Sequence, residues 1–368
     1  MSDELSVLVV GLGHMGMSHA RAYERLDGYR LAGLCARSIA SRTDLPEDWA
    51  GIPRFSDYHE ALATLKPDVV AVCTWPNTHA EYAIAAFEAG AHVFLEKPIS
   101  QTVEEAERVV AAAKAANRKL LVGISPPHSP MWIKLAEITK TLGSPLVMRM
   151  NLNQQSIGPA WNWHKDLMAS SSPVVDCGVH YVDFMCAVTG SRPVRVHAIG
   201  ARLSDEIAPD MYNYGQLQVV LEDGSVGWYE AGWGPMMSQT AFIVKDFMGP
   251  KGSVSVLAPD IVDPTPAGAT SATSSDIHTH SKIRPLRLHR AEIGPGNSLV
   301  HGDEDIDIPE RLDHTQLCER KQSFLLDAIV NDRDLSDHMR RAVDSMRIVM
   351  AADESIRTGR VVEFAWPR

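Results

Sequence analysis

The sequence is poor in cysteine and lacks any pattern among the cysteines that it has. Its five cysteines are odd in number, and no two of them form a Cys-x-x-Cys pair. This excludes a disulfide framework and a structural zinc site of the usual spacing. No apolar run approaches the ~20 residues that span a bilayer, and the first residues carry acid where a signal peptide carries base. We therefore expect a soluble cytoplasmic protein with reduced thiols and no membrane partner.

An excess of positive charge is also missing. The chain has 35 lysines and arginines against 46 acidic residues, a net charge of −11. A main partner that is nucleic acid would require a basic face, so this class is excluded. His278 and His280, with Asp276, stand in a Ser/Thr-rich stretch without a convincing third ligand, so we predict no metal site. The 368 residues, 45% of them hydrophobic, are enough for two domains.

The most informative pattern that is present lies near the N-terminus. An apolar run over residues 6–10 leads directly into glycines 11, 13 and 16 and then into a helical pattern. The first glycine allows a tight turn, the second lets the backbone approach a pyrophosphate, and the third permits close helix packing. The helix N-terminus adds unpaired N–H groups and a positive dipole. We assign this loop to a dinucleotide, with contacts from Gly11, Gly13, His14, Met15 and Gly16.

The second strand of such a fold normally ends in an acidic residue that accepts the ribose hydroxyls of NAD. Here residues 29–35 are followed by Ala36, Arg37 and Ser38, so the acid is absent and a guanidinium and a hydroxyl take its place. A fork of N–H donors suits the oxygens of a 2′-phosphate. The sequence therefore favours NADP over NAD. The alternative is that Arg37 is a solvated loop residue that stacks on the adenine.

The first third of the chain alternates between strand and helix patterns, and its strands are continuous apolar runs. This is typical of a doubly wound parallel sheet that is covered on both faces. We predict a Rossmann domain over residues 1–125, with strands at 6–10, 31–35, 52–55, 69–73, 92–95 and 120–123 and helices starting at 15 and spanning 58–65, 78–89 and 103–116.

From residue 126 onward the strands lengthen and alternate between apolar and polar residues, which favours an antiparallel sheet with one covered face. We predict an α/β domain over residues 126–368 that contains a large, mostly antiparallel open sheet. An uncovered face favours self-association as a homodimer or homotetramer. The expected parts are a helix at 131–141, strands at 146–153, 194–203, 214–221, 225–232, 240–247 and 253–257, a loop at 258–305, C-terminal helices within 315–358 and a strand at 361–366.

Four further motifs, in this order after the glycine loop, resemble the Gfo/Idh/MocA family of oxidoreductases, which includes glucose-fructose oxidoreductase and inositol dehydrogenase. They occupy residues 72–79, 89–98, 176–183 and 247–253. The resemblance implies a Rossmann domain, a second domain with an open sheet, and hydride transfer at a carbinol carbon. It also implies that the turn before the third helix approaches the nicotinamide-side ribose, and it assigns Trp75, Pro76, Asn77, His79, Glu96 and Lys97 to the cofactor. Otherwise Thr78 is simply a helix N-cap.

The chain departs from the family where many relatives carry an Arg-Phe-x-Pro element. Residues 124–130 read Ile-Ser-Pro-Pro-His-Ser-Pro, so an arginine is absent and His128 is our candidate to replace it near the substrate.

Lys97 follows the fifth strand of the predicted sheet, at the edge where ligands bind in open α/β sheets. An ammonium there can bind the substrate oxygen and stabilise a developing alkoxide. Pro98 fixes the backbone at this point, with a cis bond before it as one option. The alternative is a surface ion pair between Glu96 and Lys97.

Asp176, His180 and Asp183 are spaced at i, i+4 and i+7, so a helix that begins at Asp176 places them on one face. Histidine accepts a hydroxyl proton near neutral pH, and a carboxylate one turn away supports it. We predict that His180 is the acid/base and that Asp176 assists it at the substrate. The alternative is an N-cap aspartate and a buried structural histidine.

Trp163, His164 and Lys165 are further substrate candidates, because sugar rings pack on indole faces and their hydroxyls need polar neighbours. An aromatic packing corner is the alternative. Together the residues predict an NADP-dependent oxidoreductase of a sugar, sugar derivative or cyclic polyol. Two other hypotheses stay open: an NAD-dependent enzyme that cleaves glycosides by transient oxidation and elimination, and a cofactor-binding sensor without catalysis.

Overall fold

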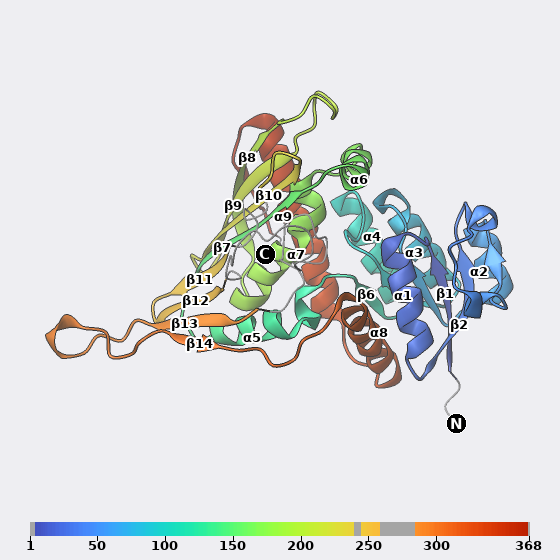
Figure 1. Cartoon of the computed structure of the whole chain (residues 1–368), viewed down its shortest axis with the longest axis horizontal. Helices are drawn as coiled ribbons and strands as arrows, with labels where there is room; N and C mark the ends of the chain where they lie inside the picture. Colours follow the sequence, from blue (N-terminus) through green and yellow to red (C-terminus); the bar gives the residue numbers. More distant parts are fainter. Residues whose placement is uncertain (1–3, 239–243, 258–283, 367–368) are drawn as a thin grey trace, which may run out of the picture. The chain divides into compact units, whose positions relative to one another are not determined.

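A computed structural model describes residues 4–238, 244–257 and 284–366. The chain separates into two compact units (Figure 1). The first unit contains Met1–Ile124 and Asp313–Met346, and the second contains Ser125–Leu312 and Arg347–Arg368. The first change of unit lies between Ile124 and Ser125. The segment from Asp313 to Met346, by contrast, returns to the first unit, although the sequence pattern had grouped it with the second domain.

The first unit is built on a parallel sheet in the order β3-β2-β1-β4-β5-β6, which confirms the doubly wound fold. All strands except the two-residue edge strand β3 are mostly buried because helices cover both faces, as their continuous apolar runs predicted. The strands are β1 Leu5–Val10, β2 Tyr29–Cys35, β3 Arg54–Phe55, β4 Val69–Val72, β5 His92–Leu95 and β6 Leu120–Val122. Its first helices are α1 His14–Arg25, α2 Tyr58–Leu65, α3 His79–Glu88 and α4 Val103–Ala115.

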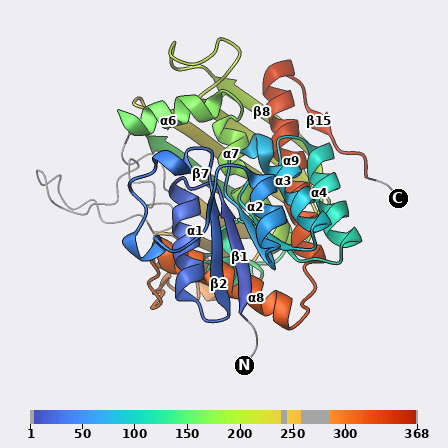
Figure 2. The same ribbon diagram turned by 90° about the vertical axis from the view of Figure 1, so that its right-hand side faces the viewer.

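Local sequence signals set the helix ends of this unit. Asp57 and Thr102 each cap the helix that follows, because their side-chain oxygens accept the backbone N–H three residues later. Helix α8, His314–Val330, starts with a capping box between Asp313 and Gln316 and packs along α1 (Figure 2). It is followed by α9, Ser336–Thr358.

Two histidines hold the edge strand β6 in place. The N–H of Lys119 donates to Nδ1 of His92, and the N–H of Val122 donates to Nε2 of His338, both over 2.9 Å. Burial lowers the pKa of each imidazole to about 4. Both rings are therefore neutral at physiological pH, which is the form that can accept a hydrogen bond.

The second unit contains a sheet in the order β14-β13-β12-β11-β7-β10-β9-β8-β15. Its pairings are antiparallel except for the parallel pair of β10 and β7, so the expected mostly antiparallel sheet is confirmed. The strands are β7 Val147–Gln155, β8 Pro193–Ala201, β9 Tyr214–Leu221, β10 Val226–Gly234, β11 Lys245–Gly249, β12 Gly252–Val256, β13 Leu286–Arg290, β14 Glu304–Ile306 and β15 Val362–Glu363.

Helices cover one face of this sheet. Helix α5, Pro130–Thr139, packs against β11 and β12, and helix α7, Pro173–Thr189, packs against β9 and β10 (Figure 1). Helix α6, Pro159–Met168, also belongs to this unit and was not predicted. No helix in the described ranges is both long and apolar enough to cross a membrane.

The expected loop at 258–305 is partly wrong, because β13 and β14 extend the sheet at its edge. Their basic and acidic side chains pair across the strands, as Arg287 does with Asp305 at 2.7 Å and Arg290 with Glu304 at 2.9 Å. The alternation in β13 is limited to Leu286 and Leu288, and β14 has only three residues, so neither strand gives a long enough apolar period to be recognised in the sequence. The expectations for residues 258–283, including Asp276, His278 and His280, lie outside the described residues, as does the start of the strand expected at 240–247.

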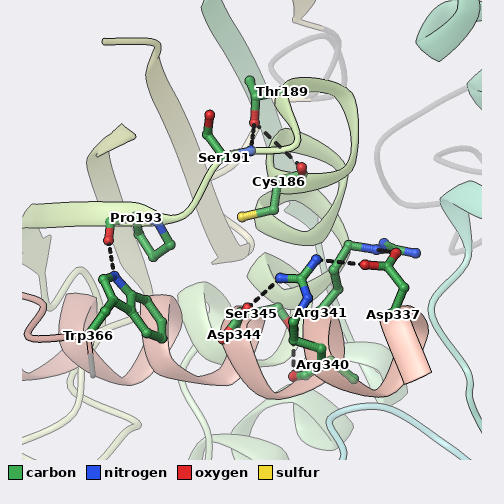
Figure 3. Close-up of polar contacts among 11 residues, drawn as sticks. Cys186, Thr189, Ser191, Pro193, Asp337, Arg340, Arg341, Asp344, Ser345 and Trp366 are labelled. Carbon is green, nitrogen blue, oxygen red and sulfur yellow. Dashed lines mark hydrogen bonds and ion pairs between the residues drawn. The ribbon is translucent and has the colours of Figure 1, made fainter. Parts of the chain in front are cut away.

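The chain returns to the second sheet at its end. Strand β15 pairs with β8, and Nε1 of Trp366 donates to the carbonyl of Pro193 over 2.7 Å (Figure 3). The guanidinium groups of Arg192 and Arg347 each lie 5.2 Å from the centre of the Trp366 ring. These contacts fix the C-terminal segment against the edge of the sheet.

Candidate active site

The glycine loop of the first unit has the geometry of a dinucleotide cradle. Gly11 has a φ of +85°, and a Cβ there would lie 2.5 Å from the carbonyl oxygen of Cys73. A Cβ at Gly16 would lie 1.7 Å from the carbonyl oxygen of Gly11. At Gly13, by contrast, a Cβ would meet nothing within 4 Å. The loop is thus closed on its inner side and open at Gly13, as a bound pyrophosphate requires.

Helix α1 begins directly at this opening. Gly13 is its N-cap and provides no side-chain cap, and the first helical hydrogen bond runs from the N–H of Met17 to the carbonyl of Gly13. The N–H groups of His14, Met15 and Gly16 therefore have no acceptor within the helix. These donors and the helix dipole fit the phosphates of a dinucleotide.

Two arginines follow β2, and the structure gives them different environments. Arg37 is exposed beside exposed Ser38, and within the described residues it has no ion-pair partner. Arg42 donates from Nη1 to the carbonyl of Leu12 over 2.6 Å and also pairs with Asp44. Arg42 therefore holds the glycine loop, a role for which the sequence offered no signal.

Lys97 lies at the carboxyl edge of the same parallel sheet. Strand β5 ends at Leu95, and the N–H of Glu96 donates to the carbonyl of Val72 at the end of β4. Lys97 is half-buried, and the peptide bond between Lys97 and Pro98 is cis. Lys97 and the glycine loop thus share the edge at which open α/β sheets bind their ligands.

Glu96 is not part of a surface ion pair. It is 6% exposed; its Oε1 lies 2.9 Å from Nε2 of His19, and its Oε2 accepts the N–H of Lys97 over 3.1 Å. Nδ1 of His19 accepts from Nε2 of Gln322 over 2.8 Å, and Oε1 of Gln322 accepts the hydroxyl of Tyr23 over 2.6 Å. We call the chain of Tyr23, Gln322, His19 and Glu96 the His19 relay.

Charges in the relay are fixed by its surroundings. Burial opposes ionisation of Glu96, but the hydrogen bond from His19 and the charges of Lys321 and Lys97 outweigh burial and hold the pKa of Glu96 below its usual range. Burial lowers the pKa of His19. The pair is best described as a carboxylate that accepts Nε2–H from a neutral imidazole whose Nδ1 accepts from Gln322.

His79 braces the other side of Lys97. It is fully buried, with Nδ1 2.7 Å from the carbonyl oxygen of Pro98 and Nε2 3.0 Å from that of Thr74. Its ring therefore contacts backbone rather than solvent. In the same turn Trp75 is 39% exposed, and Pro76 is buried beside exposed Asn77.

The hydroxyl of Thr78 does not cap α3, because it bonds to the carbonyl of Trp75 instead.

Helix α7 of the second unit carries the predicted acid/base group. It begins at Pro173, three residues before the expected start, because Ser172 provides the N-cap by accepting the N–H of Val175. The reading of Asp176 as the N-cap is thus wrong. Asp176 is 5% exposed and His180 is half-buried.

His180 is oriented by the backbone of its own unit. Its Nδ1 lies 3.3 Å from the N–H of Ser125. A backbone N–H can only donate, so Nδ1 accepts and the neutral ring carries its proton on Nε2. In this form Nε2 can donate to a substrate oxygen. If Nε2 is to take a proton from a hydroxyl, the ring must first give up the Ser125 contact, which is long and therefore weak.

The remaining substrate candidates differ in their surroundings. His128 is 5% exposed in the short helix η4, Pro126–His128, which contacts α5 and α7. On α6, Trp163 is 44% exposed, whereas His164 is buried and stacks on Trp233 with ring centres 4.4 Å apart. Lys165 pairs with Glu206 at 2.6 Å. Of the three residues on α6, Trp163 therefore offers the most surface to a ligand.

Comparisons with known proteins agree with this architecture. Residues 5–124 match the family described as "Oxidoreductase family, NAD-binding Rossmann fold", and residues 137–254 match the "GFO/IDH/MocA C-terminal domain". An inositol 2-dehydrogenase of Paracoccus denitrificans (strain Pd 1222) is 33% identical over 158 residues, which are 42% of this chain and 47% of the relative. The chain thus spans about half the length of that relative and of other inositol dehydrogenases that it matches.

Other relatives align over nearly their whole length. A D-glucoside 3-dehydrogenase of Escherichia coli (strain K12) is 25% identical over 354 residues, 89% of this chain and 94% of the relative. The crystal structure of an oxidoreductase domain protein from Kribbella flavida superposes with a TM-score of 0.79 at 21% identity and covers 100% of both chains. The structural likeness establishes the fold.

Proposed function

Because this chain belongs to the Gfo/Idh/MocA family of oxidoreductases, we propose that it is an NADP-dependent enzyme that oxidises or reduces a carbinol carbon of a sugar, sugar derivative or cyclic polyol. The bound nicotinamide supplies the hydride acceptor or donor. The observation that carries the proposal is the placement of Lys97, held from both sides at the sheet edge that also carries the open glycine loop.

Lys97 acts on the oxygen of the reacting carbon in this proposal. Its ammonium donates a hydrogen bond to that oxygen and stabilises the negative charge that develops on it. The relay through Glu96 and the brace from His79 fix the backbone on either side of Lys97. A preorganised donor of this kind needs no rearrangement during the reaction.

His180 takes the proton of the hydroxyl group when the carbinol is oxidised, and donates a proton to the carbonyl oxygen when the substrate is reduced. The contact with Ser125 places a proton on Nε2, which suits donation to the oxygen of a carbonyl substrate. Asp176 is buried four residues before it on α7 and assists as the neighbouring carboxylate. Trp163 and His128 are proposed to contact the substrate.

The preference for NADP rests on the end of β2. Arg37 and Ser38 are exposed there, and Arg37 is not engaged by any carboxylate among the described residues. Its guanidinium is thus available for a 2′-phosphate.

The test is to incubate the purified protein with NADP or NAD and a panel of polyols and sugars and to follow the absorbance of the reduced nicotinamide. His180→Ala and Lys97→Ala are each expected to reduce kcat/KM by about 10²–10⁴-fold, the usual range for acid–base groups. His301→Ala, in the same unit as His180 but exposed and paired with Glu292, is the matched control. Equal activity in His180→Ala would remove the acid/base assignment.

Release of an aglycone without net cofactor reduction would instead indicate the glycoside-cleaving reaction.

Self-association is proposed from the uncovered face of the second sheet. Val147 lies opposite Val226 in one strand pairing and opposite Met248 in the other, and each of the three is more than a third exposed. A contiguous apolar patch of this kind is typical of an interface. Light scattering at micromolar concentration is expected to show a dimer or tetramer, and Val226→Lys is expected to weaken it.

A further inference from the structure

Two positively charged side chains are buried in the second unit. Lys245, the first residue of β11, is 4% exposed, and Arg284, shortly before β13, is 9% exposed. Nη2 of Arg284 is buried and has no hydrogen-bond partner. Buried charges are ordinarily paired, because desolvation of an unpaired ion costs several kcal/mol.

The surroundings of Lys245 are aromatic. Its Nζ lies 5.9 Å from the ring centre of Trp132 on α5 and 5.8 Å from that of Tyr181 on α7. Tyr181 in turn stacks on Tyr229 of β10, with ring centres 4.5 Å apart. The faces of these rings attract a cation only weakly, so they do not replace a counter-ion.

Arg284 is close enough to act on Lys245. Burial lowers the pKa of Lys245 to about 8, and the charge of Arg284 contributes to this decrease. No carboxylate in the described part of the chain forms an ion pair with either residue. Among residues 4–238, 244–257 and 284–366, no carboxylate therefore compensates the repulsion and the desolvation of these two cations.

Two hydroxyls of the same unit also lack hydrogen-bond partners among the described residues. The hydroxyl of Tyr229 and that of Ser129, which lies next to α5, are buried without a hydrogen bond. At the two cations themselves, the unpartnered Nη2 of Arg284 is a charged donor, and such a donor is complementary to an anion rather than to a cation. The planar guanidinium fork suits the two oxygens of a carboxylate or phosphate in particular.

We propose that Lys245 and Arg284 form a binding site for an anionic group, a carboxylate or a phosphate, that is carried by the carbohydrate substrate. The identity of the molecule that carries the anion rests on the proposed function. Tyr181, whose ring contacts Lys245, follows His180 on α7, so the proposed site and the acid/base group are carried by the same unit. The substrate class then narrows to sugar acids or sugar phosphates.

The experiment measures binding without turnover, by calorimetry and thermal unfolding of the full-length, cofactor-free protein. The ligands are galacturonate, glucose 6-phosphate, neutral galactose and inorganic phosphate. We expect one of the two sugar anions to bind and to raise the melting temperature, and galactose to bind at least about tenfold more weakly, the loss expected when a hydrogen bond to a charged group is missing. Binding of galacturonate would indicate a site for a carboxylate, and binding of glucose 6-phosphate would indicate a site for a phosphate.

Two variants and a control make the test specific. Lys245→Met and Arg284→Met are each expected to weaken binding of the sugar anion at least about tenfold. Lys245→Met is also expected to raise the melting temperature of the ligand-free protein, because it replaces an unpaired buried charge by an apolar chain of similar length. Lys140→Met, at the exposed end of α5, is the control and is expected to change neither value.

Several results would overturn the inference. Equal binding of galactose would remove the anion requirement, and equal protection by inorganic phosphate would show that the anion is not part of the substrate. A lower melting temperature of Lys245→Met, without anion binding to the wild type, would show that the protein itself stabilises the charge of Lys245 and would overturn the inference. Turnover of neutral polyols alone would overturn this inference but leave the proposed function intact. Binding of a sugar anion without any reduction of the cofactor would support the anion site but contradict the proposed function.

Discussion

His19 and Glu96 form a buried pair, 77 residues apart in sequence, with Nε2 of the imidazole 2.9 Å from Oε1 of the carboxylate. The other carboxylate oxygen accepts the N–H of Lys97. His19, a side chain of helix α1, thus helps through Glu96 to fix the backbone position of the proposed catalytic residue Lys97. His19 and Glu96 are positioning residues, because the side chain of Glu96 accepts the N–H of Lys97 and His19 acts on Lys97 through Glu96.

Removal of His19 is predicted to damage both stability and turnover. His19→Leu leaves a buried carboxylate without its donor, which we expect to cost about 3–5 kcal/mol of unfolding free energy. Turnover should fall while the Kd for NADP changes little, since the glycine loop is intact. Denaturant unfolding and kcat with separate cofactor titrations measure these effects.

The control for this prediction is the paired variant His19→Leu/Glu96→Leu. It removes both polar partners and should recover much of the stability but not the turnover. If the loss of unfolding free energy in the double variant equals the sum of the losses in His19→Leu and Glu96→Leu, the two side chains are not coupled. The proposed His19 relay would then be contradicted.

Acid is predicted to destabilise the first unit through His338. Its pKa is about 4 in the folded chain against an ordinary value of 6.5, so the folded state resists protonation. The contribution of neutral His338 to the unfolding free energy is fully present above pH 6.5. It is lost progressively as the pH falls toward 4, by up to about 3 kcal/mol. Protonated His338 cannot accept the N–H of Val122.

The matched variant is His338→Gln, which keeps a hydrogen-bond acceptor but does not titrate. Urea unfolding at a series of pH values should show a flatter pH dependence for His338→Gln than for the wild type. An unchanged slope between pH 6.5 and 4 would contradict this account of the edge strand.

The two arginines after β2 are predicted to separate cofactor selectivity from cofactor binding. Arg37→Ala should raise the Kd for NADP at least about tenfold and leave that for NAD unchanged, since it removes a charged hydrogen bond to the 2′-phosphate. Arg42→Ala should weaken both cofactors alike, because Arg42 holds the carbonyl of Leu12 in the glycine loop. Calorimetric titration of each variant with both dinucleotides is the measurement, and a preference of the wild type for NAD would reverse the assignment.

The sequence predicts those parts of the molecule whose signals are local. Helix α2 lies at the predicted residues 58–65, and the glycines of the loop adopt the conformations that their positions require. The strands of the nine-stranded sheet were expected except at the β13 and β14 edge, where the apolar alternation is too short to be recognised.

Contacts between distant positions could not be predicted in the same way. Gln322 reaches His19 across 303 residues, and no periodicity in the chain reports such a pair. Lys245 was part of a predicted strand, and its burial beside Arg284 depends on the packing of α5 and α7. Charged residues are expected at the surface, so the pattern alone assigns them to solvent.

The most direct test of the central claim is to follow a label. A polyol or sugar that is deuterated at its carbinol carbons is incubated with NADP and the wild-type protein, and the dinucleotide is analysed by mass spectrometry. We predict that deuterium appears in the reduced dinucleotide and that His180→Ala and Lys97→Ala slow its appearance by about 10²–10⁴-fold. Reduced dinucleotide without deuterium, or labelling at an equal rate in both variants, would contradict the account.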